Sequence, residues 1–443
     1  MLFMKENGYF ERKIDIILQE WAKESDRKPL LLRGARQVGK SSAVRNLGKL
    51  FKSYVEVNFD DVKEVHVIFE KYVSPQEICE QLSLFYKKEI VAGETLVFFD
   101  EIQSCPAALA RMRYFYEKYQ ELHLIAAGSL LEFALKELAS FAVGRIRSIF
   151  LYPFSFEEFM LAQKNKMLVD AYRKAGPKNP LSEPIHKELI KMLKIFLVVG
   201  GMPESVAKYI DTKSFIKSQM VIDDLITAFR SDFAKYKKRI SPAYIDNVFE
   251  SAVSQADGKF VYEKVGLLNN AQVKQSLELL IMAGIIFPVT HSSANGIPLG
   301  AEANFKRRKM LLLDTGLFLR MLDFDASQIM ISDDFKTINM GVLAEMFAGL
   351  ELLKTASCYT PHQLYCWHRE KKQSNAQVDY VIQKNNRIIP IEVKSGQKGA
   401  MPSLRLFMQE KKCETGIRTS LENFGEIDNI AVYPLYAISN IIL

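Results

Sequence analysis

Residues 30–42 read Leu-Leu-Leu-Arg-Gly-Ala-Arg-Gln-Val-Gly-Lys-Ser-Ser, and this stretch decides how the first part of the chain folds. It contains Gly34-x-x-x-x-Gly39-Lys40-Ser41, the spacing of a phosphate-binding loop between a strand and a helix. The leucines before the loop suit a buried strand, and the residues after it suit a helix. The glycines let backbone N–H groups curl around phosphate oxygens at the positive end of that helix. The stretch therefore predicts a site for a nucleoside triphosphate.

The residue types within the loop indicate how each would contact ATP and Mg²⁺. Lys40 would reach the β- and γ-phosphates, and the Ser41 hydroxyl would bind Mg²⁺. The predicted nucleotide contacts of the loop are Gly34, Ala35, Arg36, Gln37, Val38, Gly39, Lys40, Ser41 and Ser42.

A pair of carboxylates follows the apolar run Thr95–Phe99, sixty residues after Lys40. At the carboxyl end of a buried strand beside the loop, Asp100 is expected to help hold Mg²⁺. Glu101 is then in place to orient and deprotonate the attacking water. The pair therefore predicts hydrolysis as well as binding.

Two further residues have alternative interpretations. Ser129 follows the next apolar strand and would either sense the γ-phosphate or merely cap the following helix. Arg145 would either be solvated or supply positive charge to the transition state. In the second case it would act within its own subunit or across the interface of a homo-oligomer.

Apolar strand-like runs alternate with helical segments along the first 150 residues, which is typical of an α/β fold with a parallel sheet covered by helices. The expected strands are 30–33, 54–59, 95–99, 122–126 and 146–151. We predict an ATPase core of the P-loop class over residues 1–165.

The remaining chain changes character twice. Residues 166–240 predict a helical lid region, and 241–325 predict short helices followed by a hairpin, the pattern of a winged-helix domain. Residues 326–443 predict a compact α/β domain. Basic segments at 235–239, 306–309 and 368–372 favour DNA as the macromolecular partner, although each alone is typical of a solvated surface.

Composition sets the broad class. The chain has 443 residues, 48% of them hydrophobic, and 59 lysines and arginines against 52 acidic residues, a net charge of +7. Five scattered cysteines without a C-x-x-C pair indicate a reducing cytoplasm. The longest apolar run, 279–289, is too short to span a bilayer, so no membrane partner is expected.

A second cluster of charged residues lies near the C-terminus. Glu392 and Lys394 alternate with apolar residues on one strand, so both point to the same face. Asp379 precedes them on the expected neighbouring strand, and Glu345 on the preceding helix would join the cluster. Asp379, Glu392 and Glu345 would bind a second divalent metal, with Lys394 stabilising phosphate charge. This is the arrangement of a nuclease-like PD-(D/E)xK fold, although Glu-x-Lys on a strand is often only a solvated ion pair.

One residue in this region argues against a regular interior strand. Pro390 lacks the N–H that a strand uses for pairing, so it predicts an edge strand or a bulge.

Taken in order, the motifs resemble those of prokaryotic AAA-type ATPases that carry a C-terminal domain of unknown function. The resemblance covers nearly the whole chain and is carried by Leu32-Arg-Gly-Ala-Arg-Gln-Val-Gly-Lys-Ser41, Phe99-Asp-Glu-Ile-Gln103, Gly144-Arg145, Leu151-Tyr-Pro-Phe-Ser-Phe-Glu-Glu-Phe159, Val199-Gly-Gly-Met-Pro-Glu204, Asp232-Phe-Ala-Lys-Tyr236, Leu312-Leu-Asp-Thr-Gly-Leu317, Val378-Asp379, Ile391-Glu-Val-Lys-Ser395 and Arg418-Thr-Ser-Leu421.

The resemblance implies an AAA+ ATPase core, a winged-helix middle and a nuclease-like C-terminal domain. The chain departs from the family pattern at Gln377, where the family often has an acidic residue, and at Ser41, where it often has threonine. The first departure weakens the case for nuclease catalysis, whereas either hydroxyl at position 41 can bind Mg²⁺.

The sequence therefore supports three hypotheses. The first is a Mg²⁺-dependent ATPase whose nucleotide state controls a DNA-binding, nuclease-like C-terminal half. The second is a nucleotide-switched protein-interaction module with a non-catalytic nuclease-like domain, and the third is an active metal-dependent nuclease.

Overall fold

The computed structural model describes residues 8–72, 74–129, 131–137, 144–237, 239–324, 340–370, 375–396 and 400–442. The chain divides into two compact units, each of which is described by itself. The first unit comprises Met1–Pro153 and Ser357–Pro361, and the second comprises Phe154–Ala356 and His362–Leu443.

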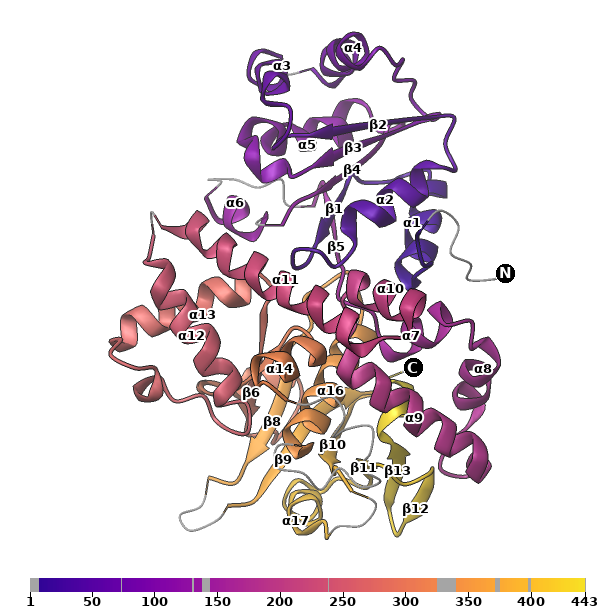
Figure 1. Cartoon of the computed structure of the whole chain (residues 1–443), viewed down its shortest axis with the longest axis vertical. Coiled ribbons are helices and arrows are strands. Elements are labelled where there is room, and N and C mark those ends of the chain that lie inside the picture. The colour runs from indigo at the N-terminus through magenta and orange to yellow at the C-terminus, as the bar shows by residue number, and fades with distance from the viewer. Residues whose placement is uncertain are drawn as a thin grey trace. The chain divides into compact units, whose positions relative to one another are not determined.

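The first unit is built on a five-stranded sheet in which every neighbouring pair is parallel (Figure 1). The strand order is β2-β3-β4-β1-β5, so β1 lies between β4 and β5. The sheet and the flanking helices confirm the predicted α/β class. The strands are β1 Leu30–Arg33, β2 Ser53–Asn58, β3 Thr95–Asp100, β4 His123–Ala127 and β5 Arg147–Phe150.

Helices connect these strands, as parallel pairing requires. Two of them, α4 and α5, begin with proline, whose fixed φ suits the first helical turn. The helices of this unit are α1 Lys13–Lys23, α2 Lys40–Gly48, α3 His66–Lys71, α4 Pro75–Tyr86, α5 Pro106–Lys118 and α6 Leu131–Glu137, with short 3₁₀ turns at Lys63–Val65 and Ile102–Ser104.

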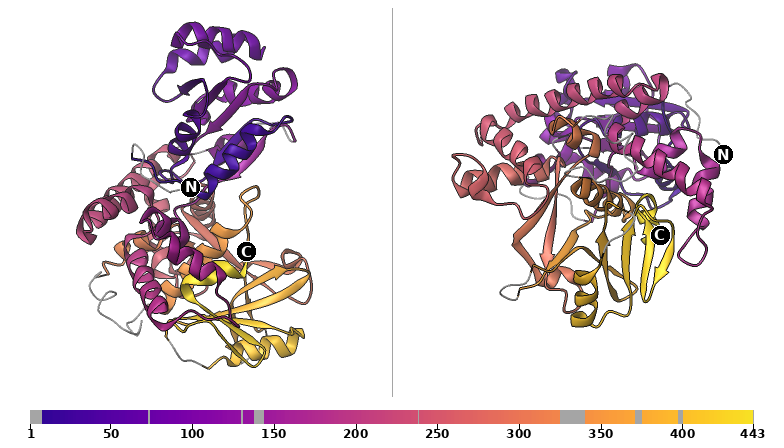
Figure 2. Two further views of the ribbon diagram at one scale, coloured as in Figure 1. Left: turned by 90° about the vertical axis from the view of Figure 1, so that its right-hand side faces the viewer. Right: turned by 60° about the horizontal axis from the view of Figure 1, so that its bottom comes forward.

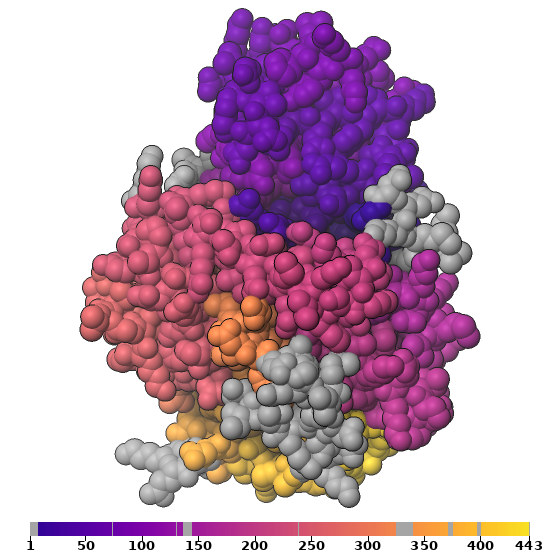
Figure 3. All heavy atoms as spheres, viewed as in Figure 1, coloured from indigo at the N-terminus to yellow at the C-terminus, as the bar shows by residue number. Residues whose placement is uncertain are grey.

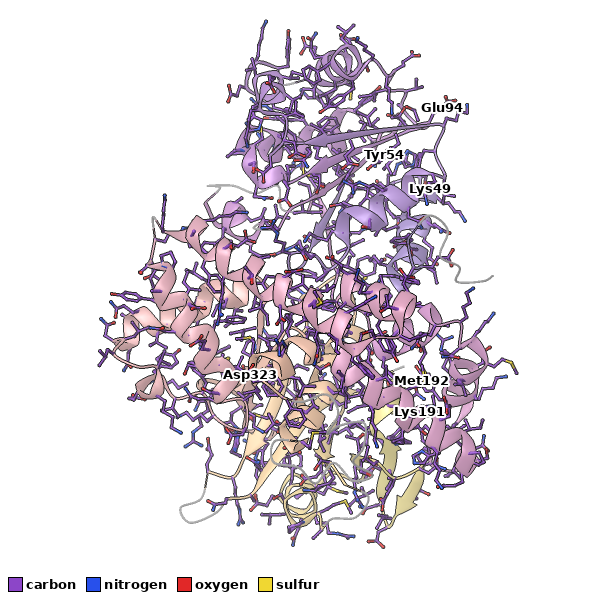
Figure 4. The ribbon with its side chains drawn as sticks, viewed as in Figure 1. Lys49, Tyr54, Glu94, Lys191, Met192 and Asp323 are labelled. Atoms are coloured by element: carbon purple, nitrogen blue, oxygen red, sulfur yellow. The ribbon has the colours of Figure 1, made fainter. Side chains whose placement is uncertain are left out.

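The three central strands β1, β3 and β4 are mostly apolar and are buried on both faces, whereas the edge strands β2 and β5 are only partly buried. One face packs against α3, α4 and α5, where Phe69, Phe99 and Phe115 meet edge to face at ring distances of 5.3 and 6.0 Å. On α2 the last residue, Gly48, lies so close to Tyr54 that an added Cβ would be 2.7 Å from its ring. Figure 4 shows Tyr54 on β2 and Lys49 just beyond α2.

The second unit is built on a mixed eight-stranded sheet, visible from salmon through yellow in the right-hand view of Figure 2. The strand order is β12-β13-β11-β10-β9-β8-β6-β7. The strands are β6 Ile286–Ser292, β7 Ala303–Leu312, β8 Leu364–His368, β9 Gln377–Lys384, β10 Arg387–Val393, β11 Gly416–Ser420, β12 Gly425–Ile427 and β13 Ile430–Pro434.

Helices precede and cover this sheet. The helix α7 begins with a capping box in which Ser155 Oγ accepts from Glu158 N at 3.2 Å and Ser155 N donates to the Glu158 carboxylate at 2.9 Å. The helices are α7 Phe156–Ala162, α8 Lys166–Lys174, α9 Glu183–Val199, α10 Pro203–Thr212, α11 Phe215–Phe233, α12 Pro242–Ser254, α13 Asn270–Met282, α14 Thr315–Met321, α16 Met340–Thr355 and α17 Pro402–Lys411, with 3₁₀ turns at Ala234–Tyr236, Tyr262–Lys264, Leu299–Glu302 and Leu435–Ile441.

The predicted hairpin of the winged-helix segment belongs to the same sheet as the C-terminal strands. The strand β6 pairs antiparallel with β7 and parallel with β8, where Val289 lies opposite Leu364. The segment 241–325 therefore shares a hydrogen-bonded sheet with the chain after it. The predicted domain boundaries stay predictions, and the one between 325 and 326 lies outside the described residues.

The inference from Pro390 is wrong. It sits on β10, which lies between β11 and β9 and is not an edge strand. Pro390 lies opposite Val381 on β9, whereas the pairing of β10 with β11 begins only at Ile391. The missing N–H therefore falls just before the stretch where both sides of the strand are paired.

A buried carboxylate fixes the turn between α9 and α10. Asp314, 1% exposed, caps α14 by accepting from Gly316 N at 2.9 Å and Leu317 N at 3.2 Å. Its other oxygen accepts from Gly201 N at 2.5 Å. Gly200 has φ +73°, and an added Cβ there would lie 2.1 Å from Asp314 Oδ1. The helix α14 packs against α9 and α11 and reaches the surface as the orange patch in Figure 3.

We expect Asp314→Ala to destabilise the second unit, because three buried backbone N–H groups lose their acceptor. The cost should be about 2 kcal/mol or more, which lowers the midpoint of thermal unfolding by at least about 4 °C. Asp224→Ala, which removes an exposed aspartate of α11, is the matched control and should leave the midpoint unchanged. Equal midpoints for the two variants would contradict the role of Asp314.

Candidate functional site

The loop between β1 and α2 has the backbone conformation that a phosphate cradle needs. Gly34 and Gly39 have φ of +140° and +96°, and Gln37 has φ +62°. At Gly34 an added Cβ would lie 2.1 Å from the carbonyl oxygen of Leu151, so only glycine fits there. These positive φ values fold the loop back over the start of α2, where N–H groups and the helix dipole favour an anion.

Lys40 is the first residue of α2 and is buried, with 7% of its surface exposed. Its ammonium group donates to the carbonyl oxygens of Gly34 at 2.9 Å and Ala35 at 2.7 Å, so the side chain runs back across the loop. Burial lowers the pKa of Lys40 to about 8, although the charges of Glu101 and Asp100 oppose the shift. A phosphate at this loop would restore the preference for the ammonium form.

Ser41 and Asp100 join the two motifs that the sequence singled out. The Ser41 hydroxyl donates to Asp100 Oδ2 at 2.9 Å, although the residues are 59 positions apart. Burial raises the pKa of Asp100, while the hydrogen bond from Ser41 lowers it. A hydroxyl and a carboxylate are hard oxygen donors of the kind that Mg²⁺ prefers, so these residues fit that ion.

Glu101 lies directly after β3 in a left-handed conformation, with φ +49° and ψ +43°. This conformation costs a non-glycine residue about 1 kcal/mol. One of its carboxylate oxygens accepts from Gln103 Nε2 at 2.5 Å, Ser129 Oγ at 3.1 Å and Ser129 N at 3.3 Å. The side chain of the candidate base is therefore held in one orientation by two polar neighbours.

Strand order explains why Ser129 meets Glu101. The strand β4 lies between β1, which leads into the loop, and β3, which ends at Asp100. Ser129 follows β4, so it lies between the two motifs at the carboxyl edge of the sheet, the edge where ligands of such sheets bind. Its predicted role toward the γ-phosphate stays a prediction.

The other residues of the loop differ in exposure. Ala35 and Val38 are buried, Arg36 is half-buried, and Gln37 and Ser42 are exposed. Their assignment as nucleotide contacts stays a prediction.

Arg12 is a loop contact that the sequence did not reveal. Its buried guanidinium donates to the carbonyl oxygens of Val38 at 3.0 Å and Tyr152 at 2.9 Å. It thereby fixes the back of the loop to the segment after β5. Nothing local marks this role, since Arg12 precedes Val38 by 26 residues.

Arg145 is exposed and forms an ion pair with Glu117 of α5. Gly144, just before it, has φ +83°. Its predicted role in stabilising the transition state stays a prediction.

The second unit brings together the charged residues predicted near the C-terminus. The register of β9 and β10 places Ile391 opposite Tyr380 and hence Asp379 opposite Glu392. Asp379 Oδ2 accepts from Val393 N at 2.8 Å, and Lys394 Nζ lies 2.7 Å from Glu392 Oε1.

Lys309 of β7, expected only as part of a basic run, adds a second ammonium group to this cluster. Its ammonium lies 2.6 Å from Glu345 Oε1 and 3.8 Å from Asp379 Oδ1. Burial opposes the charge of Lys309, but the two carboxylates together raise its pKa. Burial raises the pKa of Glu345 to about 7, while Lys309 lowers it.

The remaining carboxylate of the cluster, Glu392, is 6% exposed, and its Oε2 atom has no hydrogen-bond partner among the residues that the structure describes. Burial and the charge of Asp379 raise its pKa. Among the residues that the structure describes, no group of three or more His, Cys, Asp or Glu side chains is placed to hold a metal ion. The metal and catalytic roles of this cluster stay predictions.

Two of the predicted basic segments are described in part. Lys238 and residues 371–372 lie outside the described residues. In the third segment, Lys306 and Arg307 are exposed, whereas Lys309 is buried in the carboxylate cluster.

Three protein families match successive parts of the chain. Residues 26–160, which include most of the first unit, match the family described as AAA domain. Residues 190–328 and 340–438 match two domains of unknown function, DUF8612 and DUF4143. None of the curated proteins compared with the chain matches it.

Several solved structures are similar to the chain at low identity. A Walker-type ATPase of Pyrococcus abyssi is 16% identical over 73% of this chain and 100% of its own, with a TM-score of 0.47. The ORC1 protein of Aeropyrum pernix in complex with DNA is 14% identical over 73% of this chain and 91% of its own, with a TM-score of 0.28. Drosophila ORC bound to DNA is 15% identical over 70% of this chain and 84% of its own, with a TM-score of 0.25.

None of the helices in the described part of the chain combines enough length with enough apolar character to cross a membrane.

The lowered pKa of Lys40 predicts that affinity for ATP depends on pH. Above a pKa of about 8 the free protein loses the ammonium proton, so the Kd for ATP should rise by up to about tenfold per pH unit. Destabilisation of the folded protein by Lys40 would not explain this loss of affinity for ATP. Because the folded pKa lies below the ordinary 10.5, Lys40 makes the free energy of unfolding rise with pH between about 8 and 10.5.

Titration of the protein with a fluorescent ATP analogue between about pH 7 and pH 10 measures this dependence. Lys40→Arg is the control, because a guanidinium keeps its charge over that range. A wild-type Kd that is constant across the range would contradict the prediction.

Proposed function

We propose that the protein is a cytoplasmic, Mg²⁺-dependent ATPase whose nucleotide state controls a DNA-binding, nuclease-like C-terminal half. The observation that carries the ATPase assignment is the 2.9 Å hydrogen bond between Ser41 and Asp100. It places the hydroxyl of the phosphate loop against the carboxylate at the end of β3, beside Lys40 and Glu101.

Each residue of the site has a distinct task in this proposal. Mg²⁺, held by Ser41 and Asp100, would neutralise phosphate charge. Lys40 binds the β- and γ-phosphates from the floor of the loop. Glu101 accepts the proton of the attacking water, and the donors of Gln103 and Ser129 fix the direction in which its carboxylate points.

Chain connectivity supports control of the second unit by the first. The helix α16, which carries Glu345 of the carboxylate cluster, ends at Thr355 and is followed by Ser357–Pro361 of the first unit. Within that unit Phe150 N, at the end of β5, donates to the carbonyl oxygen of Cys358 at 2.8 Å. The strand β5 pairs with β1, which leads into the phosphate loop. A shift of the loop with the bound nucleotide would therefore pull on the chain at the end of α16.

One observation favours the alternative that the C-terminal half is a non-catalytic protein-interaction module. Lys309 places an ammonium beside Glu345 and Asp379, where a nuclease would place its metal ion. An internal cation that neutralises these carboxylates favours binding of a partner without cleavage. The alternative of an active metal-dependent nuclease requires Mg²⁺ to displace this ammonium.

We expect Lys40→Ala to lower ATP hydrolysis by at least about 100-fold, because the buried charge facing the phosphates is lost. Glu101→Gln should still bind ATP but hydrolyse it about 10²- to 10⁴-fold more slowly, because the base is lost. Steady-state release of phosphate and binding of an ATP analogue measure the two effects.

The matched controls are Lys49→Ala and Glu94→Gln, which change exposed side chains labelled in Figure 4. Both should hydrolyse ATP at the wild-type rate. Hydrolysis by Lys40→Ala at that rate would show that the site is assigned wrongly.

We further expect the full chain to bind DNA with an affinity that falls steeply between about 50 and 200 mM salt, because phosphate contacts release counterions. The affinity should differ between ATP and ADP if the nucleotide controls the C-terminal half. A mobility-shift titration with Glu101→Gln in each nucleotide measures both effects. DNA recovered intact in the presence of Mg²⁺ favours the non-catalytic hypothesis, and binding that does not depend on salt would contradict phosphate contacts.

A further inference from the structure

A cleft of about 800 Å³ opens in the second unit between the first turns of α13, the segment 259–263 and residues 305–310 of β7. We refer to it as the α13–β7 cleft. A volume of this size holds a small molecule or a few nucleotides, and it is too small for a double helix. The side chains that matter for its chemistry are Lys259, Tyr262, Lys274, Phe305, Lys306 and Arg308.

Hydrogen bonds join two walls of the cleft. Phe260 N donates to the carbonyl oxygen of Arg308 at 2.9 Å, which fixes the segment 259–263 to β7. The Arg308 guanidinium donates to Tyr262 Oη at 3.3 Å. The rings of Phe260 and Tyr262 meet edge to face at 5.8 Å. Phe260, Tyr262 and Arg308 are therefore held in a defined arrangement in the lining of the cleft.

The charge of the cleft favours an anionic occupant. Four cationic side chains line it against two carboxylates, those of Glu263 and Glu278. Glu278 is itself 4.0 Å from Lys274. Arg307, next to the cleft on β7, is exposed and adds to the positive charge.

An exposed aromatic ring identifies the kind of anion. Phe305 is 63% exposed on β7 and lies beside the exposed Lys306. An aromatic face next to cations is the arrangement that binds the bases and the backbone of single-stranded nucleic acid. The bases of a duplex are stacked on both faces and cannot offer one to Phe305.

We propose that the α13–β7 cleft binds a single-stranded segment of nucleic acid, with phosphates at Lys259, Lys274 and Lys306 and a base stacked on Phe305. This inference rests on the nucleic-acid binding of the proposed function and names its site and strand form. Arg308 lines the cleft, whereas Lys309, the next residue, faces the carboxylate cluster. The β-strand β7 therefore borders both the cleft and that cluster.

The test uses the full chain and fluorescence anisotropy of labelled oligonucleotides of about 12 nucleotides, a length within the range that single-strand modules cover. Single-stranded DNA, RNA of the same sequence and the matching duplex are compared. We expect a single strand to bind more tightly than the duplex. We also expect Phe305→Ala to weaken its binding by about fivefold or more.

Lys306→Glu combined with Lys274→Glu should weaken binding further. The slope of the logarithm of the binding constant against the logarithm of the salt concentration should also become shallower, by about 0.7 for each lost phosphate contact to a single strand. Matched controls are Phe85→Ala, which removes the exposed Phe85 on α4, and Lys217→Glu on α11. Both should bind as wild type does. Thermal unfolding of each variant shows whether it is folded, and a folded variant with lost binding supports the cleft.

The outcomes separate this inference from the proposed function. Salt-dependent DNA binding that the cleft variants do not weaken would overturn the cleft and leave the proposed function standing. Tighter binding of the duplex, with Phe305→Ala equal to wild type, would overturn the single-strand assignment. A wild-type chain that binds no nucleic acid in ATP or ADP would overturn both.

Discussion

Five strands of the first unit run in the same direction, and this common polarity is the constraint on which the nucleotide site depends. Parallel strands end at one edge, so residues 59 positions apart in sequence, Ser41 and Asp100, become hydrogen-bond partners. The order of the strands then places Ser129 between the loop and Glu101. Antiparallel pairing would send these residues to opposite ends of the sheet.

Two buried lysines show how surroundings decide the behaviour of the same side chain. Lys40 donates to neutral carbonyl oxygens, and burial lowers its pKa to about 8. Lys309 lies against two carboxylates, which raise its pKa despite burial. The first ammonium is stabilised most when a phosphate supplies the missing negative charge. The second is already neutralised, so its cluster has much less to gain from a further cation.

The parts of the fold that follow local patterns could be predicted from the sequence. Apolar runs placed the five strands of the first sheet to within a few residues, and the loop spacing predicted the turn before Lys40. Contacts across long stretches of chain could not be predicted. Arg12 reaches Val38, and β6 pairs with β8, through positions that no local pattern links. In the basic run 306–309 every residue is charged, so alternation could not show that Lys309 points inward. Pro390 gave a wrong prediction of an edge strand or bulge. Whether its missing N–H disrupts strand pairing depends on where β11 begins to pair with β10, which the sequence does not show.

The assignment of Ser357–Pro361 to the first unit has a consequence for the order of events during synthesis. Most of that unit has been synthesised once Pro153 is added, but Phe150 obtains its backbone partner at Cys358 only later. At about 5–20 residues per second, the 208 residues that follow Phe150 up to and including Cys358 (358 − 150) take about 10 to 40 s to make. Until then the Phe150 N–H lacks this partner, although β5 can already pair with β1, and the first unit is completed only after most of the second unit has been translated.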